Sequence, residues 1–286
     1  KKEDLLPLWE ITKKEALVSF ANDEIYMEKL IENPRHIEVQ ILADKFGNVV
    51  YLPERDCSIQ RNNQKMIEES PSRADKELLK KMYASAVQCA KASGYEGTGT
   101  VEFIVDKNDN YYFMEMNTRI QVEYPVTEMV TGVNLIKEQI RIASGLPLSV
   151  KQEDIKADGH AIEIRINAQN PFDNFRPGCG EVTFFLAPGG LDTRFESSLY
   201  QGEKILPFYD SMIGKLIVKG RTRMDAIKKM RRAVEETIID GVMTNLGFQY
   251  AILFDKDFIQ GNIDTNYISA KEKELIDGMS IFGKEE

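Results

Sequence analysis

Two acidic residues interrupt segments that otherwise have the composition of buried strands. In an extended chain, the side chains of residues 101–105 alternate between two faces, and Glu102 is the one charged residue among them. Residues 111–117 repeat the pattern, because Glu115 and Asn117 share a face and are flanked by methionine and aromatic residues. A buried carboxylate without a partner is costly. Two carboxylates and an amide that meet in a hairpin are hard oxygen ligands, which favour Mg²⁺ or Mn²⁺ over Zn²⁺. The alternative is two structural ion pairs with Lys or Arg from a neighbouring element.

A second polar series follows the hairpin directly. Extended backbone over residues 119–123 places Arg119, Gln121 and Glu123 on one side. Close to two metal-binding carboxylates, an Arg and a Gln form a pocket for a small anion, with Glu123 as a candidate base. The alternative is a surface Arg–Glu pair, which contributes less than about 1 kcal/mol. Polar residues at 54–56 and 60–65 show no clear periodicity, so they fit either a solvated loop or, beside a metal site, a phosphate-binding segment.

Apolar periodicity indicates the elements that would position these residues. It predicts helices over 3–21, 73–93, 126–144 and 222–239, the second with Ser72 and the last with Thr222 as N-cap. It predicts strands over 24–31, 36–42, 49–52, 98–106, 111–117, 160–168, 181–187 and 215–219. The polar, Pro-containing segment 146–159 is a candidate domain boundary. Mixed helices and hairpins favour an α+β fold.

Composition excludes several classes of protein. The 286 residues include 37 Lys plus Arg and 46 Asp plus Glu, a net charge of −9 that argues against a broad nucleic-acid or anionic-membrane surface. Three scattered cysteines and two histidines argue against structural zinc and a His-rich metal site, and they favour a reducing, cytoplasmic setting. We see neither an apolar run of about 18 to 20 residues nor a signal-peptide core, so we expect no membrane span.

Several segments of the chain resemble biotin carboxylase and follow one another in the order of that family. The most specific is Asn-Thr-Arg-Ile-Gln-Val-Glu at 117–123, and the others lie at 27–29, 33–36, 54–61, 64–65, 97–103, 115–128 and 209–216. The resemblance covers nearly the whole chain. It implies the C-terminal half of an ATP-grasp fold followed by the biotin carboxylase C-terminal domain. The implied parts are a remnant of the lid subdomain (1–31), a metal- and nucleotide-binding core (32–150), the C-terminal domain (160–267) and a tail (268–286).

The resemblance also implies an activity and the residues that carry it. Biotin carboxylase is a ligase that makes carboxyphosphate from bicarbonate and MgATP and then carboxylates N1′ of biotin. The implied metal ligands, for Mg²⁺ or Mn²⁺, are Glu102, Glu115 and Asn117. The implied nucleotide-binding residues are Glu28, Lys29, His36, Gln60, Asn63 and Lys65. Arg119, Gln121 and Val122 would bind bicarbonate, and Arg194 would stabilise the enolate of biotin. The implied catalytic residues are Glu123 as base, Arg119, Lys65 and Arg194.

The family's partners follow from its place in larger carboxylases. We expect a biotin carboxyl carrier protein, a carboxyltransferase subunit and, in the full-length form, a homodimer. The complex would carboxylate acetyl-CoA (as in fatty acid biosynthesis), propionyl-CoA or pyruvate, and the chain itself does not indicate which of them.

The chain departs from the family pattern at three places. The family begins with a nucleotide-binding-like domain and a lid with a Gly-rich phosphate loop, which we expect to precede Lys1; we therefore expect the 286 residues alone to have little or no activity. Asn63 and Tyr124 stand where the family usually has histidine. Both changes remove a group that could be cationic, which would lower nucleotide affinity at Asn63 and alter the surroundings of Glu123 at Tyr124.

Two other functions are also compatible with the sequence. Another ATP-grasp ligase, of the carbamoyl-phosphate or purine-pathway type, fits the metal hairpin but not segment 119–123 together with Arg194. A catalytically degenerate partner or scaffold subunit fits the missing lid and the two substitutions, but it has no need of buried unpaired carboxylates.

Overall fold

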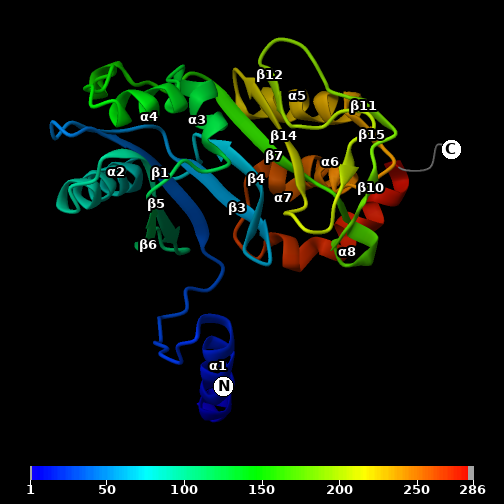
Figure 1. Cartoon of the computed structure of the whole chain (residues 1–286), viewed down its shortest axis with the longest axis horizontal. Coiled ribbons are helices and arrows are strands. Elements are labelled where there is room, and N and C mark those ends of the chain that lie inside the picture. The colour runs from blue at the N-terminus through cyan, green and yellow to red at the C-terminus, as the bar shows by residue number, and fades with distance from the viewer. Residues whose placement is uncertain (1, 283–286) are drawn as a thin grey trace. The chain divides into compact units, whose positions relative to one another are not determined.

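A nine-stranded antiparallel sheet organises the larger part of the chain, in a computed structural model that describes residues 2–282 (Figure 1). The strands lie in the order β12-β14-β7-β4-β3-β1-β5-β6, and β2 pairs with β1. Their bounds are β1 (Arg35–Ala43), β2 (Val49–Tyr51), β3 (Arg55–Arg61), β4 (Gln64–Ser70), β5 (Gly97–Val105), β6 (Tyr111–Asn117), β7 (His160–Asn167), β12 (Thr193–Glu196) and β14 (Met212–Gly220). The helices and antiparallel sheet confirm the predicted α+β fold.

One face of β1 and β5 is apolar and the other is polar. Helix α2 (Lys76–Ala92) buries Leu78, Met82 and Ala86 against Ile37 and Phe103 on the apolar face. Because side chains alternate along a strand, the neighbours of these strand residues, among them His36, Glu38 and Glu102, lie on the opposite face. The helix therefore fixes the orientation in which the strands present their charged residues.

The other half of the sheet is covered on both faces. Helix α5 (Arg223–Glu236) belongs to the same hydrophobic core as Ile162 and Ile164 of β7. Helix α3 (Tyr124–Thr131) packs Val126 and Val130 against the opposite face of β7 and β14. The remaining elements are α4 (Leu135–Ala143), α6 (Leu246–Phe254), α7 (Lys256–Gln260), α8 (Tyr267–Phe282), β8 (Gln169–Asn170), β9 (Arg176–Pro177), β10 (Gly180–Glu181), β11 (Phe184–Leu186), β13 (Lys204–Ile205), β15 (Ile238–Asp240) and the 3₁₀ turns η1 (Lys2–Asp4), η2 (Gln152–Asp154) and η3 (Pro171–Asp173).

The chain divides into two compact units, the first ending at Glu32 and the second beginning at Asn33. The first contains α1 (Leu5–Phe20), which confirms the predicted helix but buries none of its own side chains. The predicted strand over 24–31 is wrong, because these residues form no ladder and adopt no regular element. In the second unit, β4 precedes the polar segment 146–159 in the sequence and β7 follows it. These two strands pair, so the nine-stranded sheet includes strands from both sides of that segment. Part of the predicted tail is helix α8, and residues 283–286 lie outside the described residues.

Four predicted elements have to be corrected. The helix over 126–144 is divided into α3 and α4, because Gly132 ends α3 in the left-handed conformation, with φ of 73°. Helix α2 is capped by Asp75, while the Ser72 hydroxyl bonds Glu54 instead. Strand 181–187 is split between β10 and β11, and the end of the helix over 222–239 is strand β15.

The segments at 54–56 and 60–65 are the least periodic part of the sequence, and the interpretation of them as a solvated loop holds only for the exposed turn at Asn62 and Asn63. They belong largely to β3 and β4, two central strands of the sheet. Arg55, Asp56 and Gln60 are buried polar residues of β3, and such residues remove the apolar alternation that marks an ordinary strand. The remaining predicted helix and strands are confirmed within about one to three residues at their ends. No helix among residues 2–282 has the length and hydropathy of a membrane span.

Candidate functional site

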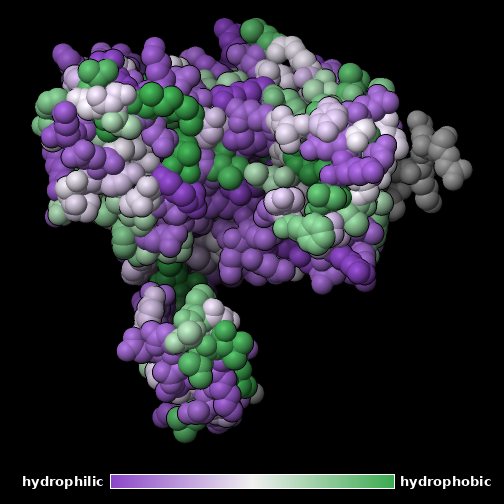
Figure 2. Space-filling model, in the orientation of Figure 1, coloured by the Kyte–Doolittle hydropathy of each residue, from purple (hydrophilic) through white to green (hydrophobic). Residues whose placement is uncertain are grey.

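A cavity of about 580 Å³ opens on the polar face of the sheet. Figure 2 shows mostly hydrophilic residues around the hollow in the middle of the unit that begins at Asn33. Strands β1, β3, β4, β5, β6 and β7 all contribute to it, together with the segment before α3. The cavity is lined by Pro34, His36, Gln60, Asn63, Gln64, Lys65, Glu102, Ile104, Met114, Glu115, Asn117, Arg119, Gln121, Val122, Glu123, Arg165, Asn167, Asp210, Met212 and Thr265. Its size is in the range of small-ligand sites.

The hairpin of β5 and β6 brings the predicted metal ligands together. Glu102 and Glu115 are directly opposite in the antiparallel ladder. The amide nitrogen of Asn117 lies 3.0 Å from one oxygen of each carboxylate. This donor set consists of hard oxygens, with an amide oxygen available if Asn117 turns, and it fits a Mg²⁺ or Mn²⁺ ion.

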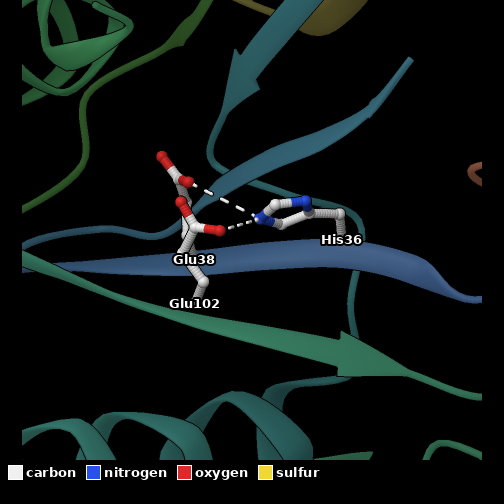
Figure 3. Close-up of side chains that lie close together, drawn as sticks. All are labelled: His36, Glu38 and Glu102. Atoms are coloured by element: carbon white, nitrogen blue, oxygen red, sulfur yellow. Dashed lines mark ion pairs between the residues drawn. The ribbon is translucent and has the colours of Figure 1, made fainter. Parts of the chain in front are cut away.

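Glu102 also belongs to a second cluster of side chains, together with His36 and Glu38 of the neighbouring strand β1 (Figure 3). Nε2 of His36 is 3.1 Å from Glu102 and 3.7 Å from Glu38. Lys65 already supplies a cation here, because its Nζ lies 2.7 Å from Glu38 and 3.1 Å from Glu102. The side of the cluster that faces Glu38 therefore already has a cation, and the Glu102–Glu115 end is the better candidate for a metal site.

A fully buried arginine underlies this group. The guanidinium of Arg55 donates to Glu38 at 2.5 Å and to Gln121 at 3.1 Å, and it also bonds Gln40, Thr100 and Thr127. Burial opposes ionisation of Glu38, but the cations of Arg55 and Lys65 outweigh it and lower the pKa of Glu38 to about 2. For Glu102, burial again opposes ionisation, and the hydrogen bond from His36 and the charge of Lys65 lower its pKa to about 2. Both residues are carboxylates at neutral pH.

Glu123 lies between two cations. One of its oxygens accepts a hydrogen bond from Nζ of Lys65 at 2.6 Å, and the other accepts one from Nη2 of Arg165 at 3.0 Å. Burial disfavours a charged Lys65, but Cys57 and the surrounding glutamates raise its pKa above the usual range. Glu123 is the N-terminal flanking residue of α3, so the helix begins at the cavity wall and fixes the backbone of Glu123.

The other predicted residues divide into two groups. His36, Gln60, Asn63, Lys65, Arg119, Gln121 and Val122 all line the cavity together with Glu102, Glu115, Asn117 and Glu123. Arg194 does not line it: its guanidinium bonds Glu128, Glu196 and the hydroxyl of Tyr124. Glu28 and Lys29 belong to the first unit, so their nucleotide-binding role stays a prediction.

Sequence reasoning missed Arg165. It lies on β7, and its guanidinium spans Glu68 at 2.5 Å and Glu123 at 3.0 Å. The signal was present, since Glu163 and Arg165 interrupt the apolar strand 160–168 in the way that Glu102 interrupts its own strand.

The chain is similar to known proteins over most of its length. Residues 1–151 match the family described as carbamoyl-phosphate synthase L chain, ATP binding domain, and residues 163–270 match the biotin carboxylase C-terminal domain. Biotin carboxylase 1 of Bacillus subtilis is 54% identical over 268 residues, which cover 93% of this chain and 60% of that protein. The chloroplastic biotin carboxylase of Arabidopsis thaliana is 52% identical over 279 residues, covering 97% of this chain and 52% of that protein.

A solved structure has the same fold. The biotin carboxylase domain dimer of Hydrogenobacter thermophilus 2-oxoglutarate carboxylase, in complex with MgADP, ADP and bicarbonate, superposes with a TM-score of 0.93. It is 45% identical, and the match covers 96% of this chain and 61% of that one. The chain thus spans between about half and three-fifths of the length of these relatives.

Proposed function

The chain belongs to the biotin carboxylase family, and on that premise we propose that it takes part in the ATP-dependent carboxylation of biotin by bicarbonate, through carboxyphosphate. This reaction is the first half-reaction of a biotin-dependent carboxylase. Because the chain covers 60% and 52% of two of its relatives, the activity is proposed for a protein of the length of those relatives, to which these residues would contribute the metal, anion and base sites.

The placement of Glu123 carries this proposal. A base that deprotonates bicarbonate must reach a bound anion, and a bound anion needs cations. Glu123 meets both requirements, because it lines the cavity and its oxygens are held by Lys65 and Arg165 at 2.6 and 3.0 Å. Arg119, Gln121 and Val122 line the same wall and would orient the bicarbonate.

Glu102, Glu115 and Asn117 would hold the Mg²⁺ or Mn²⁺ that accompanies ATP. When bound, the ion would offset charge on the transferring phosphoryl group. Among the residues of the chain, Lys65 would bind the reacting oxygens, while His36, Gln60 and Asn63 would contact the nucleotide. All of these residues line the same cavity, which supports the proposal.

We propose that Arg165, and not Arg194, stabilises the enolate of biotin. The role requires a cation that faces the reacting anion, and Arg165 lines the cavity beside the base. Arg194 is engaged by Glu128 and Glu196 outside the cavity. The enolate oxygen would accept a hydrogen bond from Arg165 while N1′ is deprotonated by phosphate released from carboxyphosphate.

The partners and setting follow from the family. Biotin would be presented on a carrier protein, and a carboxyltransferase subunit would use the carboxybiotin. A homodimer is supported by the dimer of the 2-oxoglutarate carboxylase domain. A cytoplasmic setting is supported by the scattered cysteines, while three relatives are chloroplastic. Acetyl-CoA, propionyl-CoA and pyruvate are all compatible acceptors.

Bicarbonate-dependent release of phosphate from MgATP tests the proposal. It should be measured on the full-length protein with and without free biotin. We expect biotin to stimulate the release, and we expect Glu123→Gln to lower it by roughly 100-fold or more, the scale of a lost general base. Turnover that is unaffected by Glu123→Gln would contradict the assignment.

A catalytically degenerate partner subunit is the second candidate, and the substitutions at Asn63 and Tyr124 favour it. It predicts weak binding of MgATP, no bicarbonate-dependent turnover and no effect of Glu115→Gln on binding. Calorimetric titration of the folded protein with MgATP distinguishes the two candidates even if no turnover is seen.

A further inference from the structure

Two buried carboxyl groups beneath Arg165 have no role in the proposed reaction. Glu163 is fully buried, and neither of its side-chain oxygens has a hydrogen-bond partner among the described residues. Glu68 is also fully buried: its Oε1 accepts from Nε of Arg165 at 2.5 Å, while its Oε2 has no such partner. Three unpartnered buried oxygens of this kind require an explanation.

The strand register brings these two groups together. Glu68 of β4 and Glu163 of β7 are directly opposite in an antiparallel ladder, and directly opposite side chains have Cβ atoms about 4.5–5.5 Å apart. Glu163 and Arg165 also share a face, because they are two positions apart on β7. The two carboxyl groups therefore adjoin each other and the same guanidinium.

The groups that face this pair do not supply enough positive charge for two carboxylates. Arg165 lies on β7, Lys215 on β14 and Lys65 on β4, while the N-terminal end of α3 contributes Glu123 and β3 contributes Cys57. Lys65 and Arg165 are shared with Glu123, and Lys215 donates to Val122 O and pairs with Glu196. Burial, followed by the charge of Glu68, raises the pKa of Glu163 well above its ordinary value. Burial raises that of Glu68 to about 7 against the charge of Arg165.

We propose that Glu163 is a neutral carboxylic acid that donates its proton to Oε2 of Glu68, and that this acid pair positions Arg165 against Glu123. Its consequence for catalysis rests on the proposed function, whereas the protonation of Glu163 does not. One proton satisfies an orphaned oxygen on each residue. It also leaves Oε1 of Glu68 to hold Nε of Arg165, so that Nη2 is directed at Glu123.

Ionisation of Glu163 would disturb this arrangement. A carboxylate two residues from Arg165 on the same face would compete with Glu123 for the guanidinium. Glu163 is thus a positioning residue that acts through Glu68 and Arg165. A glutamine at position 163 would still donate a hydrogen bond to Glu68. An aliphatic side chain would not, and the ionised Glu68 would then draw Arg165 away from Glu123.

Infrared spectroscopy tests the protonation without any assay of activity. The C=O stretch of a protonated carboxyl group should be present in the wild-type protein at pH 7 and absent from Glu163→Gln, with the exposed substitution Glu96→Gln as the matched control. A wild-type spectrum identical to that of Glu163→Gln in this region would overturn the proposal, because Glu163 would then be ionised.

Kinetics on the full-length protein tests the positioning. We expect Glu163→Leu to lower kcat/KM for biotin by at least about tenfold, the scale on which a displaced clamp residue acts. Glu163→Gln should restore most of that loss. Equal losses in the two variants, both shown to be folded by circular dichroism, would contradict a role for the donated hydrogen bond. Absence of turnover from the wild-type protein would count against the proposed function, and the infrared result would still decide the acid pair.

Discussion

Nη2 of Arg165 lies 3.0 Å from Oε2 of Glu123, and the two residues come from different elements, strand β7 and the turn before α3. The contact joins the carboxylate that the sequence marks as a base to a cation that follows it by 42 residues. Lys65 holds the other oxygen of Glu123 at 2.6 Å. Glu123 therefore lines the cavity between two cations, an arrangement that suits the proposed binding and deprotonation of a small anion.

The opposed carboxylates of the β5–β6 hairpin predict a dependence on divalent metal. Glu115→Gln should lower bicarbonate-dependent phosphate release by roughly 100-fold, as for the loss of one strong electrostatic contact, and raise the Mg²⁺ concentration needed for half-maximal rate. Phosphate release is measured across a Mg²⁺ titration. Glu96→Gln is the exposed control and should behave as wild type. A normal Mg²⁺ dependence in Glu115→Gln would rule out this hairpin as the metal site.

Asn63 lines the cavity where the family usually has histidine. Asn63→His should lower KM for MgATP by about three- to tenfold, about the worth of one charge-assisted hydrogen bond, and leave kcat nearly unchanged. Asn63 has φ of 62°, a conformation that histidine also tolerates better than most residues. The neighbouring Asn62→His is the matched control, since Asn62 also has positive φ, at 49°, but does not line the cavity. An equal effect of both changes would show that position 63 does not contact the nucleotide.

Glu69 predicts a pH-dependent contribution to stability. Burial opposes its ionisation, but the hydrogen bond from His160 and the charge of Arg223 lower its pKa to about 2. The folded state then binds fewer protons at this residue than the unfolded state between about pH 2 and pH 4.5, the range between its folded pKa and the ordinary glutamate value. The stabilisation is therefore present above this range and is lost as the pH falls through it.

Glu69→Gln should consequently lower the free energy of unfolding at pH 7 by about 3 kcal/mol, as when one partner of a buried ion pair is removed, and by much less near pH 2 to 3. Urea unfolding at the two pH values measures the difference, with Glu96→Gln as control. A destabilisation that is the same at both pH values would mean that the carboxylate charge is not the cause.

The sequence predicted the hairpin and its residues well, because a carboxylate in an apolar strand stands out against a regular alternation. Strands β3 and β4 were missed for the opposite reason: their buried faces carry charged groups such as Arg55 and Glu68, which compensate one another only in three dimensions. The contact between Arg165 and Glu123 likewise depends on the packing of α3 against β7 and β14, a long-range contact that local periodicity does not contain.

The matched pair Arg165→Ala and Arg194→Ala tests the central claim most directly. Incorporation of radiolabelled bicarbonate into carboxybiotin should be measured in the full-length protein, together with circular dichroism to establish folding. We expect Arg165→Ala to lower carboxybiotin formation by roughly 100-fold or more, the scale of one lost cationic contact to a developing anion, and Arg194→Ala to lower it by much less. Full activity in Arg165→Ala together with its loss in Arg194→Ala would contradict the account.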